Sequence, residues 1–179
     1  MIVALLRGKL PHRYFAEPRV HSGSSAEIDV LPAQDVYEVL VYDEKRHCRL
    51  VAAVEIISPA NKDRPDHRRA FVSKCIALLR ERVSVVLVDV VTTRTHNLYG
   101  ELLGQIGQAD PGLNPEPPLY TAACRLTKRE DDWHLETWAQ SLDLGRPLPT
   151  MPLWLADNLA VPLELEESYE QSCGIVSIP

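Results

Sequence analysis

Two acidic residues stand inside the most apolar stretches of this chain. Glu55 lies in the run VAAVEII (residues 51–57), and Asp89 lies in VVLVDVV (residues 85–91). An unpaired carboxylate in such surroundings costs several kcal/mol, so it must be protonated, hydrogen-bonded, ion-paired or bound to a metal ion. Both residues are near the C-terminal ends of predicted strands, where open α/β sheets tend to place ligand sites. The sequence therefore indicates a candidate site around these two residues.

Lys74 is a candidate partner for these carboxylates. It follows Phe71 by three residues and precedes Leu78 by four, so it shares or borders the helix stripe that should face the sheet. A lysine in this position either extends to solvent or pairs with a carboxylate. Both alternatives are compatible with the sequence.

Asp29 is the second acidic residue that could act together with Glu55. The segment EIDV (residues 27–30) alternates, which places Glu27 and Asp29 on one face of a predicted strand. If that strand neighbours the strand of Glu55, Asp29 and Glu55 could share a hard divalent cation such as Mg²⁺ or Mn²⁺. The alternative is a solvent-facing acidic pair on a half-buried strand.

The elements that must position these residues follow from hydrophobic periodicity and turn residues. The predicted helices span residues 1–10, about 66–80, 96–108 and 163–171, and the predicted strands span 13–20, 26–30, 35–42, 48–57, 83–91, 119–126 and 133–138. Residues 58–65 (SPANKDRP) are a loop by composition, and Asp66 is the predicted cap of the following helix. The nearly unbroken apolar run 83–91 is typical of a strand covered on both faces, which indicates a strand-helix-strand crossover.

Composition limits the classes of function. The net charge of −6 argues against broad non-specific nucleic-acid binding, which usually needs a basic domain. Basic residues crowd at Lys45 to His47 with Arg49 and again from Lys62 to Arg69, and both stretches are predicted to be solvated surface. The four cysteines form no Cys-x-x-Cys pair, so no zinc ribbon is indicated. With no signal peptide or membrane-spanning run, a cytoplasmic protein is predicted.

Three motifs together carry a resemblance to a known family. They are EIISPANK (residues 55–62), Phe71-x-x-Lys74, and the apolar strand that contains Asp89. In these the chain resembles a bacterial family of unknown function with the signature Glu-Ile-x-Ser-Pro-x-Asn-Lys. That family is similar to the Uma-type endonucleases of the PD-(D/E)XK nuclease-like superfamily. The similarity extends over most of the chain, from residues 10–14 to the PLP segment at 147–149 and the last helix.

The resemblance implies a role for each motif residue. Asp29 would be the metal-binding aspartate, Glu55 the acidic residue of the next motif, and Lys74 a lysine that has moved from the strand to the helix. Such a site binds Mg²⁺ or Mn²⁺ and activates water for attack on a phosphodiester, while the lysine stabilises the developing charge. Ile57 occupies the usual strand-lysine position, so Lys62 or Lys74 must substitute for it. The further candidates in the same motifs are Ser58, Asn61, Lys62 and Asp89.

The predicted architecture is a single α/β domain with a mixed central sheet. Residues 1–126 would form the PD-(D/E)XK-like core, and residues 127–179 a C-terminal hairpin, a proline-rich extended segment at 145–152 and a helix. No feature of the sequence specifies the oligomeric state.

Two functions stay open. One is a non-catalytic descendant of the nuclease fold, in which Glu55, Asp89 and Lys74 form a buried polar network and the protein works by binding. The other is a Mg²⁺-dependent nuclease or phosphodiesterase that uses Asp29, Glu55 and Lys74, with nucleic acid as its partner. The missing strand lysine and the acidic composition favour the first. A hydrolase built on Ser58 with His67 or His96 is weaker, because no nucleophile elbow surrounds the serine.

Overall fold

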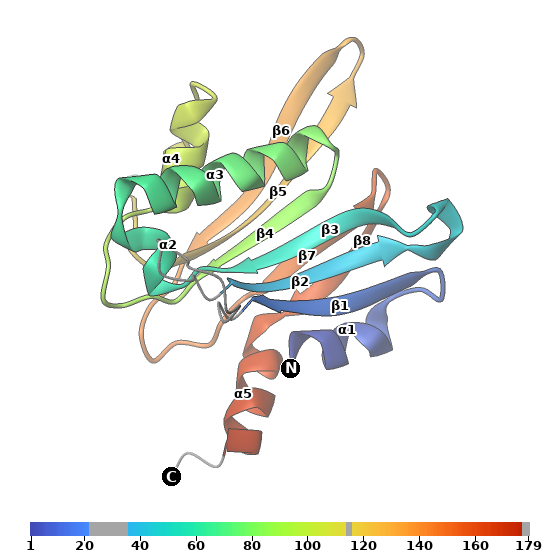
Figure 1. Cartoon of the computed structure of the whole chain (residues 1–179), viewed down its shortest axis with the longest axis horizontal. Helices are drawn as coiled ribbons and strands as arrows, with labels where there is room; N and C mark the ends of the chain where they lie inside the picture. Colours follow the sequence, from blue (N-terminus) through green and yellow to red (C-terminus); the bar gives the residue numbers. More distant parts are fainter. Residues whose placement is uncertain (22–35, 114–115, 177–179) are drawn as a thin grey trace, which may run out of the picture.

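Residues 1–21, 36–113 and 116–176 are described by the computed structural model, which forms a mixed α/β fold (Figure 1). The larger of its two sheets has six strands in the order β1-β2-β3-β4-β5-β6. Its strands are β1 (Tyr14–His21), β2 (Val36–Asp43), β3 (Arg49–Ile56), β4 (Ser84–Asp89), β5 (Tyr120–Arg129) and β6 (Asp132–Ser141). Neighbouring strands are antiparallel except β3 and β4, which are parallel. The sheet is therefore mixed, as the sequence predicts.

The parallel pair is joined by two helices, α2 (Pro59–Asp63) and α3 (Pro65–Arg80). Every residue of β4 is buried, as its apolar composition predicts for a strand covered on both faces. Helix α4 (Leu98–Gln105) packs beside α3 on the same face of the sheet (Figure 1). The hydrophobic core between these helices and the sheet includes Val72, Cys75, Leu87, Leu98 and Tyr120.

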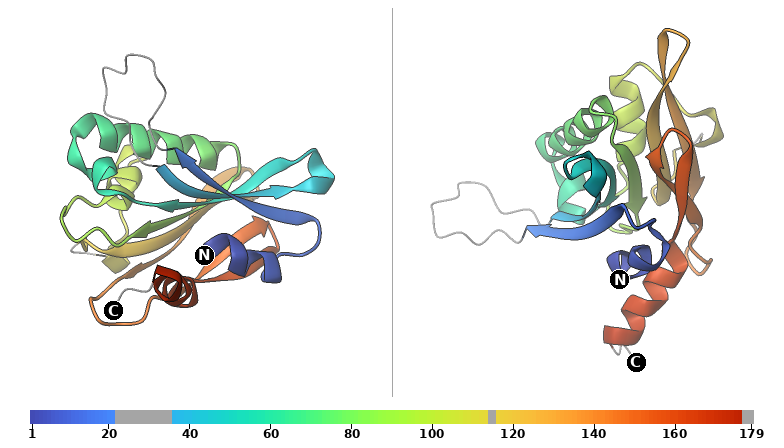
Figure 2. Two further views of the ribbon diagram at one scale, coloured as in Figure 1. Left: turned by 60° about the horizontal axis from the view of Figure 1, so that its bottom comes forward. Right: turned by 90° about the vertical axis from the view of Figure 1, so that its right-hand side faces the viewer.

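A hairpin of β7 (Thr150–Ala156) and β8 (Leu159–Glu164) covers the other face of the sheet and contacts β3, β4 and β5. Helices α1 (Ile2–Lys9) and α5 (Leu165–Val176) lie next to this hairpin, as the views in Figure 2 show. Two 3₁₀ turns, Glu44–Arg46 and Pro111–Leu113, complete the regular elements of the described chain.

Alternation along the central strands decides which side chains meet α3. Val54 of β3 and Val86 of β4 pack in the core under the hairpin, whereas Leu87 packs in the core under α3 and α4. Since successive side chains point to opposite faces, Glu55 lies on the same face as Leu87. The fold therefore places Glu55 between the sheet and α3.

The structure corrects the sequence prediction at three places. Residues 59–63 form the short helix α2 instead of a loop, and α3 begins at Pro65, so Asp66 lies in its first turn and is not its cap. The β7–β8 hairpin was not predicted, because its prolines 152 and 162 argue against a strand. Prolines are tolerated there because both strands of a two-stranded sheet are edge strands, and Pro152 and Pro162 are paired with each other. The predicted strand 26–30 lies outside the described residues.

No helix within the described part of the chain is long and apolar enough to cross a membrane.

Candidate functional site

Glu55 is held almost completely out of solvent near the end of β3, with 1% of its surface exposed. The strand pairing sets it directly opposite Glu38 of β2 on one side and Leu87 of β4 on the other. Glu38 is itself 8% exposed. Two carboxylates thus stand side by side on the face of the sheet that α3 covers.

Lys74 of α3 reaches both carboxylates with one ammonium group. Its Nζ lies 2.7 Å from Oε2 of Glu55 and 2.8 Å from Oε2 of Glu38. Because both oxygens contact the same nitrogen atom, the two carboxylate groups are close neighbours. Of the two alternatives for Lys74, the structure shows the carboxylate pair, and the lysine side chain is still 36% exposed. We call Glu38, Glu55 and Lys74 the carboxylate-lysine cluster.

Arg19 of β1 adds a second cation at the edge of this cluster. It is paired with Glu38 across the β1–β2 ladder, and its Nη1 lies 3.5 Å from Oε1 of Glu38. The Arg19 side chain is 53% exposed, so its attraction to Glu38 is partly screened by water. The carboxylate of Glu38 is therefore better compensated than that of Glu55.

The protonation of Glu55 reflects this uneven compensation. The pKa of Glu55 is raised to about 7, chiefly by burial; Lys74 opposes this shift, and the neighbouring Glu38 adds to it. Burial alone would lower the pKa of Lys74, but the two carboxylates more than offset that effect, so its pKa is raised. Lys74 therefore stays charged at neutral pH, while the Glu55 carboxyl is far easier to protonate than an exposed glutamate.

One oxygen of Glu55 has no partner. Oε1 is buried and makes no hydrogen bond with any group in the described residues. A cavity of about 140 Å³ adjoins the cluster and is lined by Tyr37, Glu55, Ile56, Asn61, Ala70, Phe71 and Lys74. Because buried polar atoms are normally hydrogen-bonded, the unpartnered Oε1 is the most unusual polar atom of this site.

Asp29, the predicted partner of Glu55, lies outside the described residues, so the structure does not place it. Glu38 is the carboxylate that the structure sets beside Glu55, and it was missed by the sequence analysis. Glu38 is the charged residue in the otherwise apolar run VYEVLV (residues 36–41), a signal of the same kind as that of Glu55. Its importance depends on the β2–β3 register, which composition alone does not give.

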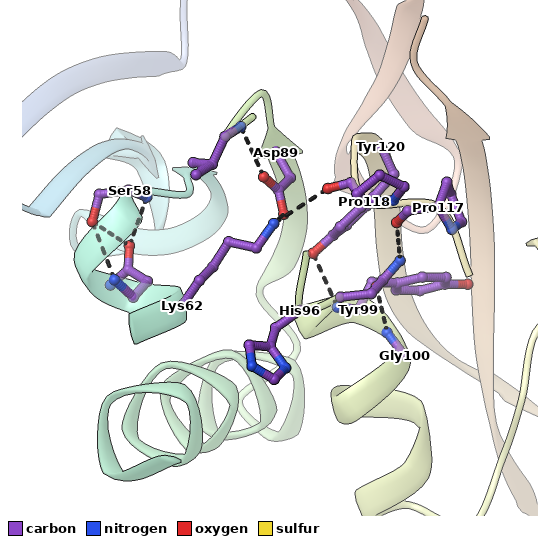
Figure 3. Close-up of polar contacts among 12 residues, drawn as sticks. Ser58, Lys62, Asp89, His96, Tyr99, Gly100, Pro117, Pro118 and Tyr120 are labelled. Atoms are coloured by element: carbon purple, nitrogen blue, oxygen red, sulfur yellow. Dashed lines mark hydrogen bonds and ion pairs between the residues drawn. The ribbon is translucent and has the colours of Figure 1, made fainter. Parts of the chain in front are cut away.

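Asp89 belongs to a different cluster (Figure 3). Its Oδ2 accepts a hydrogen bond from Nζ of Lys62 at 2.8 Å, and both side chains are 0% exposed. Lys62 also donates to the carbonyl oxygen of Pro118, and Oδ1 of Asp89 accepts from the Val91 amide. Burial raises the pKa of Asp89, while its bonds to Lys62 and Val91 oppose that shift. The prediction that Lys62 is solvated surface is therefore wrong, and no contact links it to Glu55.

Ser58 and Asn61 hold α2 in place. Oγ of Ser58 accepts from the Asn61 amide, and Oδ1 of Asn61 accepts from the Ser58 amide at 2.8 Å, which makes a reciprocal cap of the helix (Figure 3). His67 contacts the carbonyl oxygen of Ala60. These contacts account for Ser58 and Asn61 as structural residues, and no hydrogen bond joins Ser58 to a histidine in the described residues.

The described residues contain no group of three or more His, Cys, Asp or Glu side chains arranged to hold a metal ion. The carboxylate-lysine cluster therefore offers two carboxylates at most from this part of the chain. Comparison with known proteins gave no match: no family model, curated protein or solved structure matches the chain.

Proposed function

We propose that the carboxylate-lysine cluster is the site of a metal-dependent nuclease or phosphodiesterase. The observation that carries this proposal is the unpartnered, buried Oε1 of Glu55 beside a second carboxylate and a lysine. An oxygen in that state lacks a cation or a hydrogen-bond donor, and the raised pKa of Glu55 reflects the same deficit. The adjoining cavity offers space for such a group.

The residues fit a hard divalent cation. Mg²⁺ and Mn²⁺ prefer carboxylate oxygens, and Mg²⁺ is usually held by one or two carboxylates together with water and substrate phosphate oxygens. Glu55 and Glu38 would hold the ion, and Asp29 remains a proposed third ligand on the evidence of the sequence. When bound, such an ion lowers the pKa of a coordinated water and stabilises charge on a phosphoryl group.

Lys74 would supply fixed positive charge beside the reacting phosphate. Its ammonium group is anchored by Glu38 and Glu55, and 36% of the side chain is open to solvent, so a substrate oxygen can approach it. A preoriented cation of this kind stabilises negative charge as it develops in a transition state. The lysine would thus act from a helix, in place of the strand position that Ile57 occupies.

The fold is compatible with this role. The three antiparallel strands β1 to β3, the crossover through α3 and the parallel strand β4 agree with the mixed sheet and crossover that the nuclease-like resemblance implies. We therefore propose a PD-(D/E)XK-like core, in which Glu55 on β3 and Lys74 on α3 form the reactive face, in a cytoplasmic protein that acts on nucleic acid.

A second candidate is a non-catalytic binding domain, and one observation favours it. Lys74 already sits within hydrogen-bond distance of both carboxylates, and only 1% of Glu55 is exposed. A cluster in which the charges compensate one another can be purely structural. The buried Lys62–Asp89 pair shows that this fold uses such pairs elsewhere.

The two candidates differ in their response to metal. Thermal unfolding of the full chain is measured with Mg²⁺ or Mn²⁺ added against EDTA, for the natural sequence, for Glu55→Gln and for the exposed control Glu81→Gln. Cleavage of labelled single-stranded and duplex DNA and RNA is measured in parallel. The nuclease proposal expects metal to stabilise the natural chain and Glu81→Gln, and it expects Glu55→Gln to lose both stabilisation and cleavage.

Two other results would count against the nuclease proposal. Stabilisation by metal without cleavage of any substrate would favour the binding domain. Absence of metal-dependent stabilisation, or cleavage that survives Glu55→Gln, would exclude this cluster as the catalytic site.

A further inference from the structure

A second charged cavity lies where the β7–β8 hairpin meets the sheet, close to the C-terminal end of α3. It has a volume of about 230 Å³. Residues of the β2–β3 and α3–β4 connections, of strands β3, β4 and β5, and of the β7–β8 hairpin line it. Its lining includes four arginines, Arg46, Arg49, Arg82 and Arg125, and one acidic residue, Asp157. In a chain whose net charge is −6, this is a local excess of positive charge.

Arg125 is the most firmly held of the four. Its side chain is 15% exposed, and its Nε and Nη2 lie 2.8 and 2.7 Å from Oε2 of Glu136. Nη1 donates to the carbonyl oxygen of Asp157, and the guanidinium carbon lies 3.4 Å from the centre of the Trp154 ring. Arg125 and Trp154 therefore form a rigid, preordered wall of the cavity.

The other three arginines keep donors available. Arg49 donates through Nη2 to the carbonyl oxygen of Glu81. Nη2 of Arg82 is 3.9 Å from Asp157, and Nε of Arg46 is 3.7 Å from Asp43. Both distances exceed a normal hydrogen bond, so these contacts do not use up the guanidinium donors. Three partly satisfied guanidinium groups thus border one small space.

Trp154 provides an independent indication of a missing acceptor. Its indole Nε1 is buried and has no hydrogen-bond partner in the described residues, and Trp154 is one of the residues that line the cavity. A buried indole N–H usually finds an acceptor. The residues around this cavity offer many donors and few acceptors, and an oxyanion supplies several acceptors at once.

We propose that this cavity binds the phosphate group of a small phosphorylated molecule. The guanidinium fork matches the oxygens of a phosphate in bidentate geometry, and a dianion compensates the excess of positive charge better than a single carboxylate does. The arginines gather around one small cavity and do not form a long basic stripe, so the site suits a small molecule better than a nucleic-acid strand. Two of its arginines, Arg46 and Arg49, come from the basic stretch that the sequence analysis assigned to solvated surface.

The site is distinct from the carboxylate-lysine cluster, because the two cavities share no lining residue. Binding is measured by calorimetry on the full chain with inorganic phosphate and with ribose 5-phosphate, at constant ionic strength set by chloride. We expect saturable binding with a dissociation constant near the millimolar range or tighter. Arg49→Gln combined with Arg82→Gln should weaken it about tenfold or more, because charge-assisted bonds are lost.

Arg80→Gln is the charge-matched control, because Arg80 is exposed nearby but does not line the cavity. The affinity of Arg80→Gln for inorganic phosphate and for ribose 5-phosphate should stay within about twofold of that of the natural chain. If the double variant does not fold, Arg46→Gln alone must still weaken binding. Absence of saturable binding, or equal loss in Arg80→Gln, would overturn the proposal. Tighter Arg49-dependent binding of duplex DNA or of phosphatidate vesicles than of ribose 5-phosphate would also overturn it.

Discussion

Glu38 and Glu55 are directly paired across the β2–β3 ladder, and they share the ammonium group of Lys74. Like charges directly opposite each other on one face of a sheet are destabilising, so this pair needs a cation between them. Lys74 supplies it from the covering helix. The stability of this pair therefore depends on the charge of Lys74.

Replacing Lys74 should lower the stability of the fold. Lys74→Met leaves two buried carboxylates without their shared cation, and we expect it to lower the free energy of unfolding by about 1 to 3 kcal/mol at neutral pH. This is less than for a fully buried pair, because the Lys74 side chain is 36% exposed. Urea unfolding measures the change, with Lys128→Met on the exposed β5 end as the control. Adding Glu55→Gln to Lys74→Met should recover part of the loss, and a purely additive double variant would contradict the shared-cation account.

The Arg13–Asp43 ion pair predicts a dependence on acid. Asp43 is buried at the end of β2, and its bonds to the guanidinium of Arg13 hold the pKa of Asp43 below its usual value. A carboxylate with a lowered folded-state pKa stabilises the fold fully above its unfolded-state pKa, and the contribution is lost as pH falls through the folded-state value. Asp43→Asn should therefore cost stability at neutral pH, and the difference from the natural chain should shrink below about pH 4. A difference that does not change with pH would show that the two residues interact only through packing.

The helix pattern could be read from the sequence because it is local. The spacing of Phe71, Lys74 and Leu78 placed the lysine near the face of α3 that meets the sheet, and the apolar run around Asp89 indicated a strand covered on both faces. These features depend on neighbours within a few residues. The mixed sheet and its crossover followed from them.

The partners of the buried charges could not be read in the same way. Glu38 meets Glu55 only in one register, and that register depends on the Glu44–Arg46 turn and on an irregularity at Val41 and Tyr42. A slip of one residue would turn Glu38 to the opposite face. The prediction for the metal pair rested on Asp29, and the described residues do not include it.

The burial of Lys62 is a second feature that could not be predicted from the sequence. A basic residue between Asn61 and Asp63 has the composition of a surface loop, yet Lys62 is fully buried against Asp89. Its burial depends on contacts 27 residues along the chain with Asp89 and 56 residues along with Pro118. No local pattern encodes such contacts.

The reciprocal cap of α2 can be tested at Ser58. Ser58→Ala removes the side-chain acceptor of the Asn61 amide, and we expect a loss of about 1 kcal/mol in the free energy of unfolding. Ser73→Ala on the exposed face of α3 is the control and should cost nothing measurable. Any metal-dependent cleavage should persist in Ser58→Ala, measured per folded molecule. A variant that keeps its stability but loses cleavage would instead assign the serine to the reaction.

The buried Lys62–Asp89 pair gives a prediction with its own internal control. Removing one partner leaves an uncompensated charge at a site that is 0% exposed. Lys62→Met and Asp89→Asn should therefore each cost about 3 to 5 kcal/mol in denaturant unfolding. Replacing both residues removes both charges, so the double variant should be far more stable than the sum of the single effects predicts. A coupling energy near zero would mean that the carbonyl oxygen of Pro118 and the Val91 amide, rather than the ion pair, satisfy these two groups.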